Sequence, residues 1–185
     1  MAKIELNSAL KAIHGGLDNW VYRNIRGQMV LSRRPTASGT VSEAQADVRE
    51  RFRHAAAYAK ATLLDTIQRA AYDMVAKAKG LPVFSVMLTD FLKPPVVELL
   101  DLTAYHGQVG DVIRVSASDY VGVTAVNVAI RAPDLTVREE GAAVLQSGVW
   151  VYTATTLRIA EEAVTITATA VDRPGHTGTK IESWV

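Results

Sequence analysis

A chain of 185 residues is long enough for one large domain or two small ones, and its hydrophobic fraction of 49% is typical of a protein that buries a core. The absence of cysteine excludes disulfides, thiolate chemistry and cysteine-based zinc sites. No stretch approaches the roughly 20 apolar residues of a membrane-spanning helix, and the N-terminal residues lack the apolar run of a signal peptide. We therefore expect synthesis in the cytoplasm without a cleaved signal, and membership of an extracellular or virion assembly stays open.

The net charge of +1 hides an asymmetry between the two halves of the chain. Residues 1–93 hold 14 basic and 8 acidic side chains, which gives +6, whereas residues 94–185 hold 6 and 11, which gives −5. The basic half suits a polyanion, or it suits the acidic half of the next subunit in a head-to-tail contact. Two domains with ordinary surfaces are the third interpretation.

The segment over residues 15–35 predicts a β-hairpin, in which residues 18–25 and 28–34 pair across a turn. Before it, apolar residues at helical spacing within residues 1–14 predict a short helix or a loose arm. Alternation along the hairpin places apolar side chains on both faces, and an isolated hairpin is marginal in water. It must therefore pack on its own helices or on another subunit. The predicted assembly interface consists of Trp20, Tyr22, Ile25, Met29 and Leu31.

Arginines gather on this hairpin and on the helix predicted after it. A basic two-stranded ribbon can enter the major groove of a nucleic acid, but arginines on an edge hairpin also keep the edge soluble. Nothing in the sequence aims a side chain at a base edge, so both interpretations stay open. The predicted basic patch consists of Arg23, Arg26, Arg33, Arg34, Arg49 and Arg53.

Three helices are predicted between the hairpin and residue 93. Thr40 begins the first with a capping-box pattern completed by Glu43. A second follows over residues 64–79, after a join between residues 62 and 66, with an apolar pattern that includes Ile67 and Met74. Pro82 opens the third, which ends at a pair of prolines. The stripe predicted to be buried on the first helix consists of Val41, Ala44, Val48, Phe52, Ala56, Ala59 and Leu63.

After the prolines the hydrophobic period changes from 3.6 to 2, and turn signals recur between short apolar runs. Many short strands with recurring turns indicate a β-sandwich of about 90 residues. The predicted fold class is therefore α+β, with a hairpin-and-helix module over residues 1–93 and an all-β sandwich over residues 94–185. The predicted strands cover residues 96–102, 112–117, 121–131, 136–143, 149–155, 164–171 and 177–185.

Two stretches of the second half, GDVIRVSASDYVGVTAVNVAI and TATAVDRPGHTGTK, resemble bacterial immunoglobulin-like repeat domains. The first stretch is similar to the family's strand, Asp-containing loop and following strand, and the second to its closing strand and Asp-x-x-Gly-x turn. His176 stands where the family usually has Asn. The resemblance implies an immunoglobulin-like sandwich of the kind that acts as a spacer or an adhesive module, and it implies no particular ligand.

The first half, over residues 15–65, resembles an uncharacterised group of bacterial proteins. In that group a glycine-rich hairpin ends in an Arg-Ser-x-Pro-like stretch and precedes an Arg-Phe-containing helix. Here the order is Ser32, Arg33, Arg34, Pro35, so the Arg-Ser order is reversed. The resemblance implies a hairpin-plus-helix arrangement and no activity.

No pattern of catalytic or cofactor-binding residues is present, so we expect neither an enzyme nor a bound cofactor. The histidines at positions 14, 54, 106 and 176 lack metal-ligand spacing, and no phosphate loop or nucleophile elbow occurs. Asp119 and Asp172 are interpreted as turn formers or as joint calcium ligands. The acidic pairs that begin at Glu139 and Glu161 are expected in solvated loops.

The leading hypothesis is a non-enzymatic structural subunit that assembles with copies of itself into a filament, tube, ring or appendage. The N-terminal module would form the contacts, head to tail, and the immunoglobulin-like domain would lie outside. One alternative is a nucleic-acid-associated protein that uses the basic patch. The other is an adhesive or carbohydrate-binding module that uses Tyr105, Tyr120 or Trp184.

Overall fold

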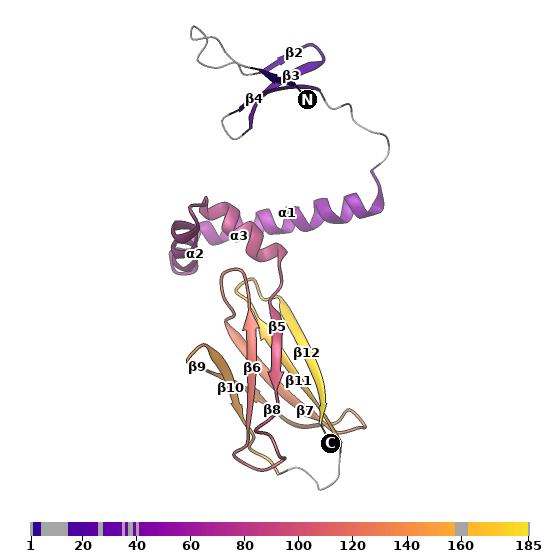
Figure 1. The fold of residues 1–185 in the computed structure, drawn as a ribbon, viewed down its shortest axis with the longest axis vertical. Coiled ribbons are helices and arrows are strands. Elements are labelled where there is room, and N and C mark those ends of the chain that lie inside the picture. The colour runs from indigo at the N-terminus through magenta and orange to yellow at the C-terminus, as the bar shows by residue number, and fades with distance from the viewer. Residues whose placement is uncertain are drawn as a thin grey trace. The chain divides into compact units, whose positions relative to one another are not determined.

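The computed structural model describes residues 2–4, 15–25, 28–34, 36, 39, 41–157 and 163–184. The chain forms two compact units, Met1–Ala46 and Asp47–Val185, which are described separately below. The fold class is α+β, as predicted, with the helices in the N-terminal half and the larger sheets in the C-terminal half (Figure 1). The predicted boundary at residue 93 separates the last helix from the first strand of the sandwich, whereas the two compact units meet between residues 46 and 47.

The first unit is built on a four-stranded antiparallel sheet in the order β1-β4-β3-β2. The predicted hairpin is present as β3 and β4, in register from Trp20 opposite Arg33 to Ile25 opposite Gln28. Two short strands that the sequence did not predict extend it on both sides. The turn predicted at residues 26 and 27 and the helix predicted before residue 14 lie outside the described residues. The strands are β1 (Ala2–Ile4), β2 (Gly15–Leu17), β3 (Trp20–Ile25) and β4 (Gln28–Arg33).

Three helices follow: α1 (Glu43–Leu64), α2 (Thr66–Lys79) and α3 (Val83–Leu92). A reciprocal capping box precedes α1, but its members are Ser42 and Gln45 rather than Thr40 and Glu43. The Gln45 N–H donates to the Ser42 hydroxyl over 3.3 Å, and the Ser42 N–H donates to the Gln45 side-chain oxygen over 3.4 Å. Thr40 itself lies outside the described residues.

The predicted join between the first two helices is confirmed at Asp65. This residue is extended, with φ −93° and ψ 106°, and its carboxylate accepts the N–H groups of Ile67 and Gln68 as the N-cap of α2. The predicted stop at Gly80 is also confirmed, because its φ of 63° is the left-handed value of a helix C-cap. Pro82 then precedes α3.

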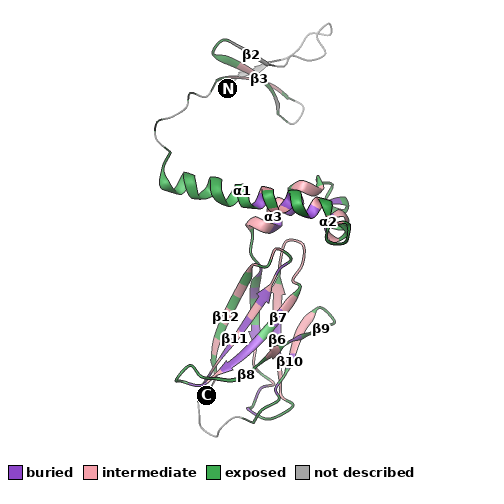
Figure 2. Cartoon of the chain, turned by 180° about the vertical axis from the view of Figure 1, so that it is seen from behind, coloured by how far each residue is buried: buried purple, intermediate pink, exposed green. Residues whose placement is uncertain are grey.

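The three helices share a small core in the second unit, formed by Ala59, Tyr72, Ala76, Val86 and Met87. The stripe predicted to be buried on α1 is covered only in part. Its C-terminal end packs against α2 and α3, but every residue from position 43 to 54 is exposed (Figure 2). Phe52 is 51% exposed and Val48 is 63% exposed. The prediction was wrong for this half because helical spacing identifies an apolar face without showing what covers it.

The rest of the second unit is two four-stranded antiparallel sheets, in the orders β5-β6-β10-β9 and β12-β11-β7-β8. All seven strands predicted for this half are present, and the one predicted to end at residue 143 is followed by the additional strand β9. The strands are β5 (Val96–Asp101), β6 (Val112–Ser118), β7 (Ala125–Arg131), β8 (Val137–Ala142), β9 (Val144–Gln146), β10 (Val149–Thr153), β11 (Val164–Val171) and β12 (Thr177–Trp184).

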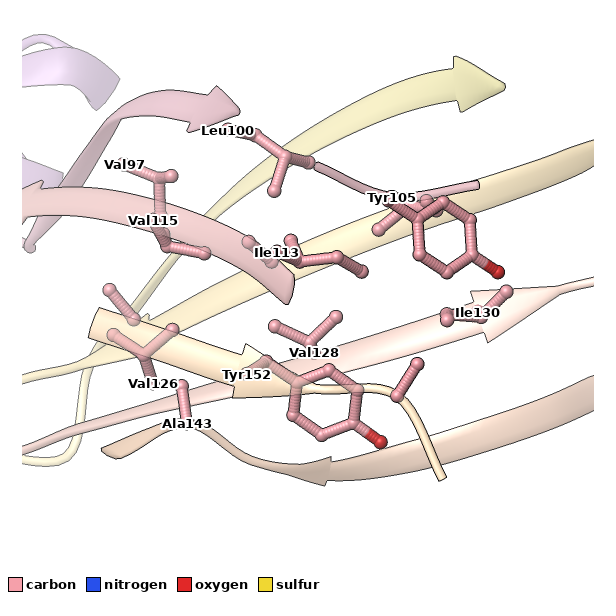
Figure 3. Close-up of a cluster of buried hydrophobic side chains, with 14 of the residues drawn as sticks. Val97, Leu100, Tyr105, Ile113, Val115, Val126, Val128, Ile130, Ala143 and Tyr152 are labelled. Atoms are coloured by element: carbon pink, nitrogen blue, oxygen red, sulfur yellow. The ribbon is translucent and has the colours of Figure 1, made fainter. Parts of the chain in front are cut away.

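The two sheets bury their facing side chains in one core (Figure 3). Strict alternation along β11 sends Val164, Ile166, Ala168 and Ala170 inward, and Val126, Val128 and Ile130 of β7 are buried too. Burying one such aliphatic side chain contributes about 1.5–3 kcal/mol. Trp150 is partly buried and packs against this cluster.

The close approach of β5 and β12 depends on a glycine. A Cβ atom built on Gly178 would clash with the carbonyl oxygen of Pro95, a backbone atom that no side-chain rotation can move. We therefore expect Gly178→Ala to lower the free energy of unfolding by about 2–4 kcal/mol, measured by chemical denaturation. Gly39→Ala is the matched control, because a Cβ there meets nothing within 4 Å. Equal stability of the two variants would contradict the packing of β5 on β12.

Candidate assembly surfaces and the helix–sandwich junction

The sheet of the first unit gathers four of the five predicted interface residues on one face. Residues directly opposite each other in an antiparallel pair share a face. Tyr22 lies opposite Leu31, and alternation puts Trp20 and Met29 on the same side. The fifth residue, Ile25, is on the other face, as its position in β3 requires.

This sheet has no buried layer within the described part of the chain. Each side chain of the first unit whose exposure is described is intermediate or exposed, and Trp20 is 45% exposed. Ile25 on the opposite face is 46% exposed. The sheet therefore leaves large apolar side chains half open to water on both faces.

A second apolar surface runs along the helices. The exposed stripe of α1 contains Val48 and Phe52 at i and i+4. On α2, Ile67 and Met74 belong to the apolar pattern that predicted the helix, and they are 86% and 69% exposed. Leu64, at the join, is 87% exposed. The helices therefore have exposed apolar side chains in addition to those buried in their own small core.

The described arginines of the predicted basic patch do not form one surface. Arg33 lies opposite Trp20 and shares its face, whereas alternation places Arg23 on the other face of the sheet. On α1, Arg53 is held by Glu50 at 2.8 Å, while Arg49 is exposed on the same helix. Arg34 is exposed just after β4, and Arg26 lies outside the described residues.

The helices dock on the sandwich through two of its loops. Tyr120 and Val121, between β6 and β7, pack on the helical core, and the Lys79 ammonium lies 3.4 Å from the centroid of the Tyr120 ring. From the turn between β11 and β12, His176 meets the Phe91 ring edge-on, with ring centroids 4.7 Å apart. These contacts make the helices and the sandwich one compact unit.

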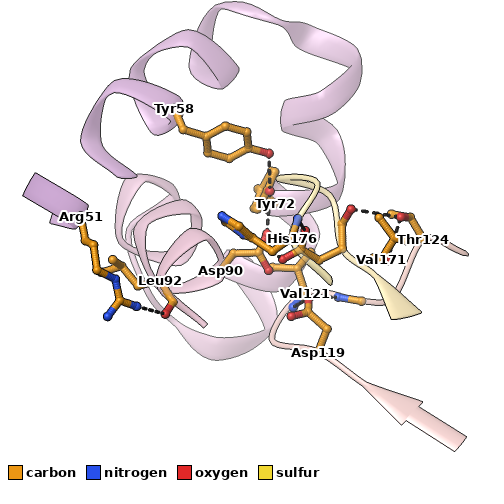
Figure 4. Close-up of polar contacts among 12 residues, drawn as sticks. Arg51, Tyr58, Tyr72, Asp90, Leu92, Asp119, Val121, Thr124, Val171 and His176 are labelled. Atoms are coloured by element: carbon orange, nitrogen blue, oxygen red, sulfur yellow. Dashed lines mark hydrogen bonds and ion pairs between the residues drawn. The ribbon is translucent and has the colours of Figure 1, made fainter. Parts of the chain in front are cut away.

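A polar chain is buried at this junction (Figure 4). The hydroxyls of Tyr58 and Tyr72 lie 2.9 Å apart, and the Tyr72 hydroxyl donates to Asp90 Oδ2 over 2.7 Å. Asp90 is fully buried. Burial raises its pKa to about 7; the hydrogen bond from Tyr72 opposes this rise, and the nearby carboxyls of Asp119 and Asp172 add to it. Burial, with the hydrogen bonds to Tyr58 and Asp90, also raises the pKa of Tyr72.

The structure brings Asp119 and Asp172 to the same junction, and both form turns as predicted. Asp119 Oδ2 accepts the N–H groups of Val121 and Gly122, and Asp172 accepts the N–H of His176 over 2.6 Å. Within the residues that the structure describes, no group of three or more acidic or histidine side chains is arranged to hold a metal ion. The calcium interpretation therefore receives no support from these residues.

The junction also forms a small open pocket of about 290 Å³ between α1, α3 and the turn before β12. It brings His54 and His176, which are far apart in the sequence, to one place beside Arg51 and Phe91. The Arg51 guanidinium is 3.5 Å from the Leu92 carbonyl oxygen, and His176 Nδ1 is 3.2 Å from Asp172 Oδ2. Neither histidine is paired with a nucleophile in these contacts, so the pocket has no triad-like geometry.

Glu139 was expected in a solvated loop, and that prediction was wrong. It is 7% exposed and anchors the segment after β10 to β8. Its carboxylate accepts the hydroxyls of Tyr152 over 2.7 Å, Thr155 over 2.8 Å and Thr156 over 2.7 Å, along with the N–H groups of both threonines. Burial alone would raise its pKa, but these hydrogen bonds outweigh burial and hold the pKa below its ordinary value. Glu140 is exposed, as predicted, and the pair at positions 161 and 162 lies outside the described residues.

No helix in the described part of the chain has the length and apolar character needed to cross a bilayer. Comparison of the chain with protein-family models, with curated proteins and with solved structures found no match.

Replacing Glu139 tests its anchoring role. Glu139→Gln puts an amide donor among groups that are themselves donors, so we expect a loss of about 1–3 kcal/mol in the free energy of unfolding at pH 7. Because the folded pKa is lowered, the stabilisation is present above the ordinary pKa of 4.5 and is lost as pH falls through the folded value. Wild type should therefore lose stability on acidification more steeply than the variant. The control is Glu140→Gln; an equal loss in both variants would contradict the anchor.

Proposed function

We propose that this protein is a non-enzymatic structural subunit that assembles with copies of itself through the sheet of its first unit. The observation that carries the proposal is the apolar face of Trp20, Tyr22, Met29 and Leu31, which has no buried layer within the described residues. A sheet of four short strands needs one covered face to be stable in water. A second subunit supplies that cover.

Two further features support a contact between identical subunits. The exposed stripe of α1, with Val48 and Phe52, is a second apolar surface on the same chain. The charges of +6 over residues 1–93 and −5 over residues 94–185 favour contact between unlike halves of neighbouring subunits. Contacts between unlike surfaces propagate into rings or open filaments. We propose a head-to-tail homo-oligomer of this kind.

We further propose that the sandwich is immunoglobulin-like and serves as the outer spacer of the assembly. If β5 to β12 are taken as strands A, B, C, C′, D, E, F and G, the two sheets become A-B-E-D and G-F-C-C′. Immunoglobulin constant-type domains pair an ABED sheet with a CFG sheet. The strand order therefore supports the proposal, with C′ as one additional edge strand.

The same geometry gives less support to nucleic-acid binding and to carbohydrate binding. Nucleic-acid binding needs arginines along one surface, and Arg23 and Arg33 lie on opposite faces of the sheet. A carbohydrate-binding module needs open aromatic rings. Tyr105 is only 3% exposed and stacks on Trp184 with ring centroids 5.2 Å apart, and Tyr120 lies beneath Lys79.

The first test is the mass of the nuclease-treated protein, measured by light scattering after size separation. We expect a mass many times the 20.0 kDa of one chain. Trp20→Ala combined with Tyr22→Ala should yield a folded and smaller species, whereas Gln28→Ala, on the other face of the sheet, should leave the mass unchanged. A wild-type mass of one chain would contradict the proposal. Unfolding of the double variant would show that this face belongs to the core of a single subunit.

The stripe of α1 gives a second prediction. Phe52→Ala should change the stability of a dissociated subunit by less than about 0.5 kcal/mol, because the ring is 51% exposed there. The same change should weaken the association of subunits by about 1 kcal/mol or more. The variant should therefore be half-dissociated at a higher protein concentration than wild type. Lys60→Ala, at an exposed position of α1 that is not part of the stripe, is the control. Equal effects on subunit and assembly would exclude the stripe from the contact.

A further inference from the structure

The helix–sandwich junction contains two buried carboxylate oxygens, Asp90 Oδ1 and Asp119 Oδ1, that have no hydrogen-bond donor among the residues that the structure describes. The other oxygen of each carboxylate, Oδ2, already accepts hydrogen bonds. Asp90 Oδ2 accepts from the Tyr72 hydroxyl, and Asp119 Oδ2 accepts two backbone N–H groups of its own loop. The unpaired oxygens thus belong to α3 on one side and to the sandwich on the other. A buried acceptor without a donor costs about 1–3 kcal/mol, and more when it is charged.

Two ionised carboxylates cannot be held together in such a site without a positive charge between them, but one proton removes the conflict. We propose that Asp90 and Asp119 share one proton, and that this O–H···O bond fastens α3 to the loop of residues 119–122. The inference goes beyond the proposed assembly and does not depend on it. Titration of this proton then controls how firmly the helices are docked on the sandwich.

The charges of the groups around Asp90 and Asp119 decide whether the protonated or the ionised form of Asp90 is favoured. From α1 and α2, Tyr58 and Tyr72 contribute neutral hydroxyls. From the turn before β12, Asp172 adds a further negative charge, and its Oδ2 lies 3.2 Å from His176 Nδ1. The cations Lys79 and Lys93 lie on the Tyr120 ring, 3.4 and 5.5 Å from its centroid, and neither contacts Asp90 in the hydrogen bonds and ion pairs described above. The balance around Asp90 is negative, so its protonated form is favoured.

The pKa of Asp90 agrees with this geometry. Desolvation raises it most, and the Asp119 carboxyl raises it further through its charge and through a side-chain hydrogen bond. A folded pKa of about 7 against an ordinary 3.8 means that the unfolded chain releases the proton first as pH rises. Stability supplied by the shared proton is therefore complete below the ordinary value, falls between the two values and is absent above about pH 7.

The test replaces the proton by an amide. In Asp90→Asn the amide oxygen can accept from Tyr72 while the NH₂ group donates to Asp119 Oδ1. In Asp119→Asn the oxygen can accept the two backbone N–H groups while the NH₂ group donates to Asp90 Oδ1. Each single variant thus carries a permanent donor between the two side chains. Asp73→Asn is the matched control, an exposed aspartate of α2 that pairs with Arg69.

The unfolding equilibrium constant of the full chain is to be measured by chemical denaturation from pH 5 to pH 8. As pH rises from 5 to 8, loss of the Asp90 proton by itself should raise the unfolding equilibrium constant of wild type roughly a hundredfold. The control Asp73→Asn should show the same rise as wild type. Asp90→Asn and Asp119→Asn should lose most of this slope and be more stable than wild type at pH 8. Slopes that stay at the wild-type value in both variants would overturn the proposal.

A second measurement detects the proton directly and does not depend on reversible unfolding. The infrared spectrum of wild type at pH 6 should contain the C=O band of one protonated carboxylic acid, because exposed carboxyls are ionised at that pH. The band should be absent above pH 8 and absent in both asparagine variants. Wild type without the band would overturn the proposal. So would stabilisation of wild type by calcium at pH 8 that either asparagine variant abolishes, because a cation would then occupy the place of the proton.

Discussion

An antiparallel sheet is stable in water only when at least one of its faces is covered, because the apolar half of its alternating side chains must leave the solvent. The sandwich meets this constraint internally. Its two sheets cover each other, and the side chains between them, such as Ile113, Val128 and Ile166, are almost fully buried. The sheet of the first unit has the same alternation, but the described residues supply no covering layer. The proposed function follows from that difference between two sheets of one chain.

The helices contain both a covered part and an uncovered part. Their C-terminal part is covered, since α2 and α3 enclose Ala59 and Tyr72, and the loops of the sandwich complete this core. Their N-terminal part repeats the same apolar spacing without a partner among the described residues of the second unit, so Phe52 stays half exposed. A helix that continues its stripe beyond its own core has a surface suited to another chain. The proposed assembly would cover both of these surfaces.

The junction is organised differently from the rest of the protein, because polar groups take the place of apolar packing at its centre. Asp90 is buried among tyrosines and near two further aspartates, where an apolar side chain would have been simpler. Buried charges of this kind contribute little net stability but make docking depend on their protonation. The shared proton gives a physical reason for placing an ionisable group at the point where helices and sandwich meet.

The sequence alone determined the local structure of this protein. Period-2 alternation identified all seven predicted strands after the prolines, and Asp65 and Gly80 marked a helix start and a helix end, because these signals act over a few neighbouring residues. It did not determine which apolar faces are covered, so Val48 and Phe52 were assigned to a buried stripe although both are exposed. Burial depends on what packs against an element, and that information is spread over distant segments.

The tertiary structure also decided the chemistry of the acidic residues. Glu139 and its neighbour Glu140 look alike in the sequence, yet the first is enclosed by threonine and tyrosine hydroxyls and the second is solvated. Asp90 stood in a helix pattern without any signal that it would meet Asp119, because 28 residues lie between them and the chain changes there from helices to strands. Hydrogen bonding and desolvation arise only when the chain is folded, so the pKa of a carboxyl is a property of tertiary structure.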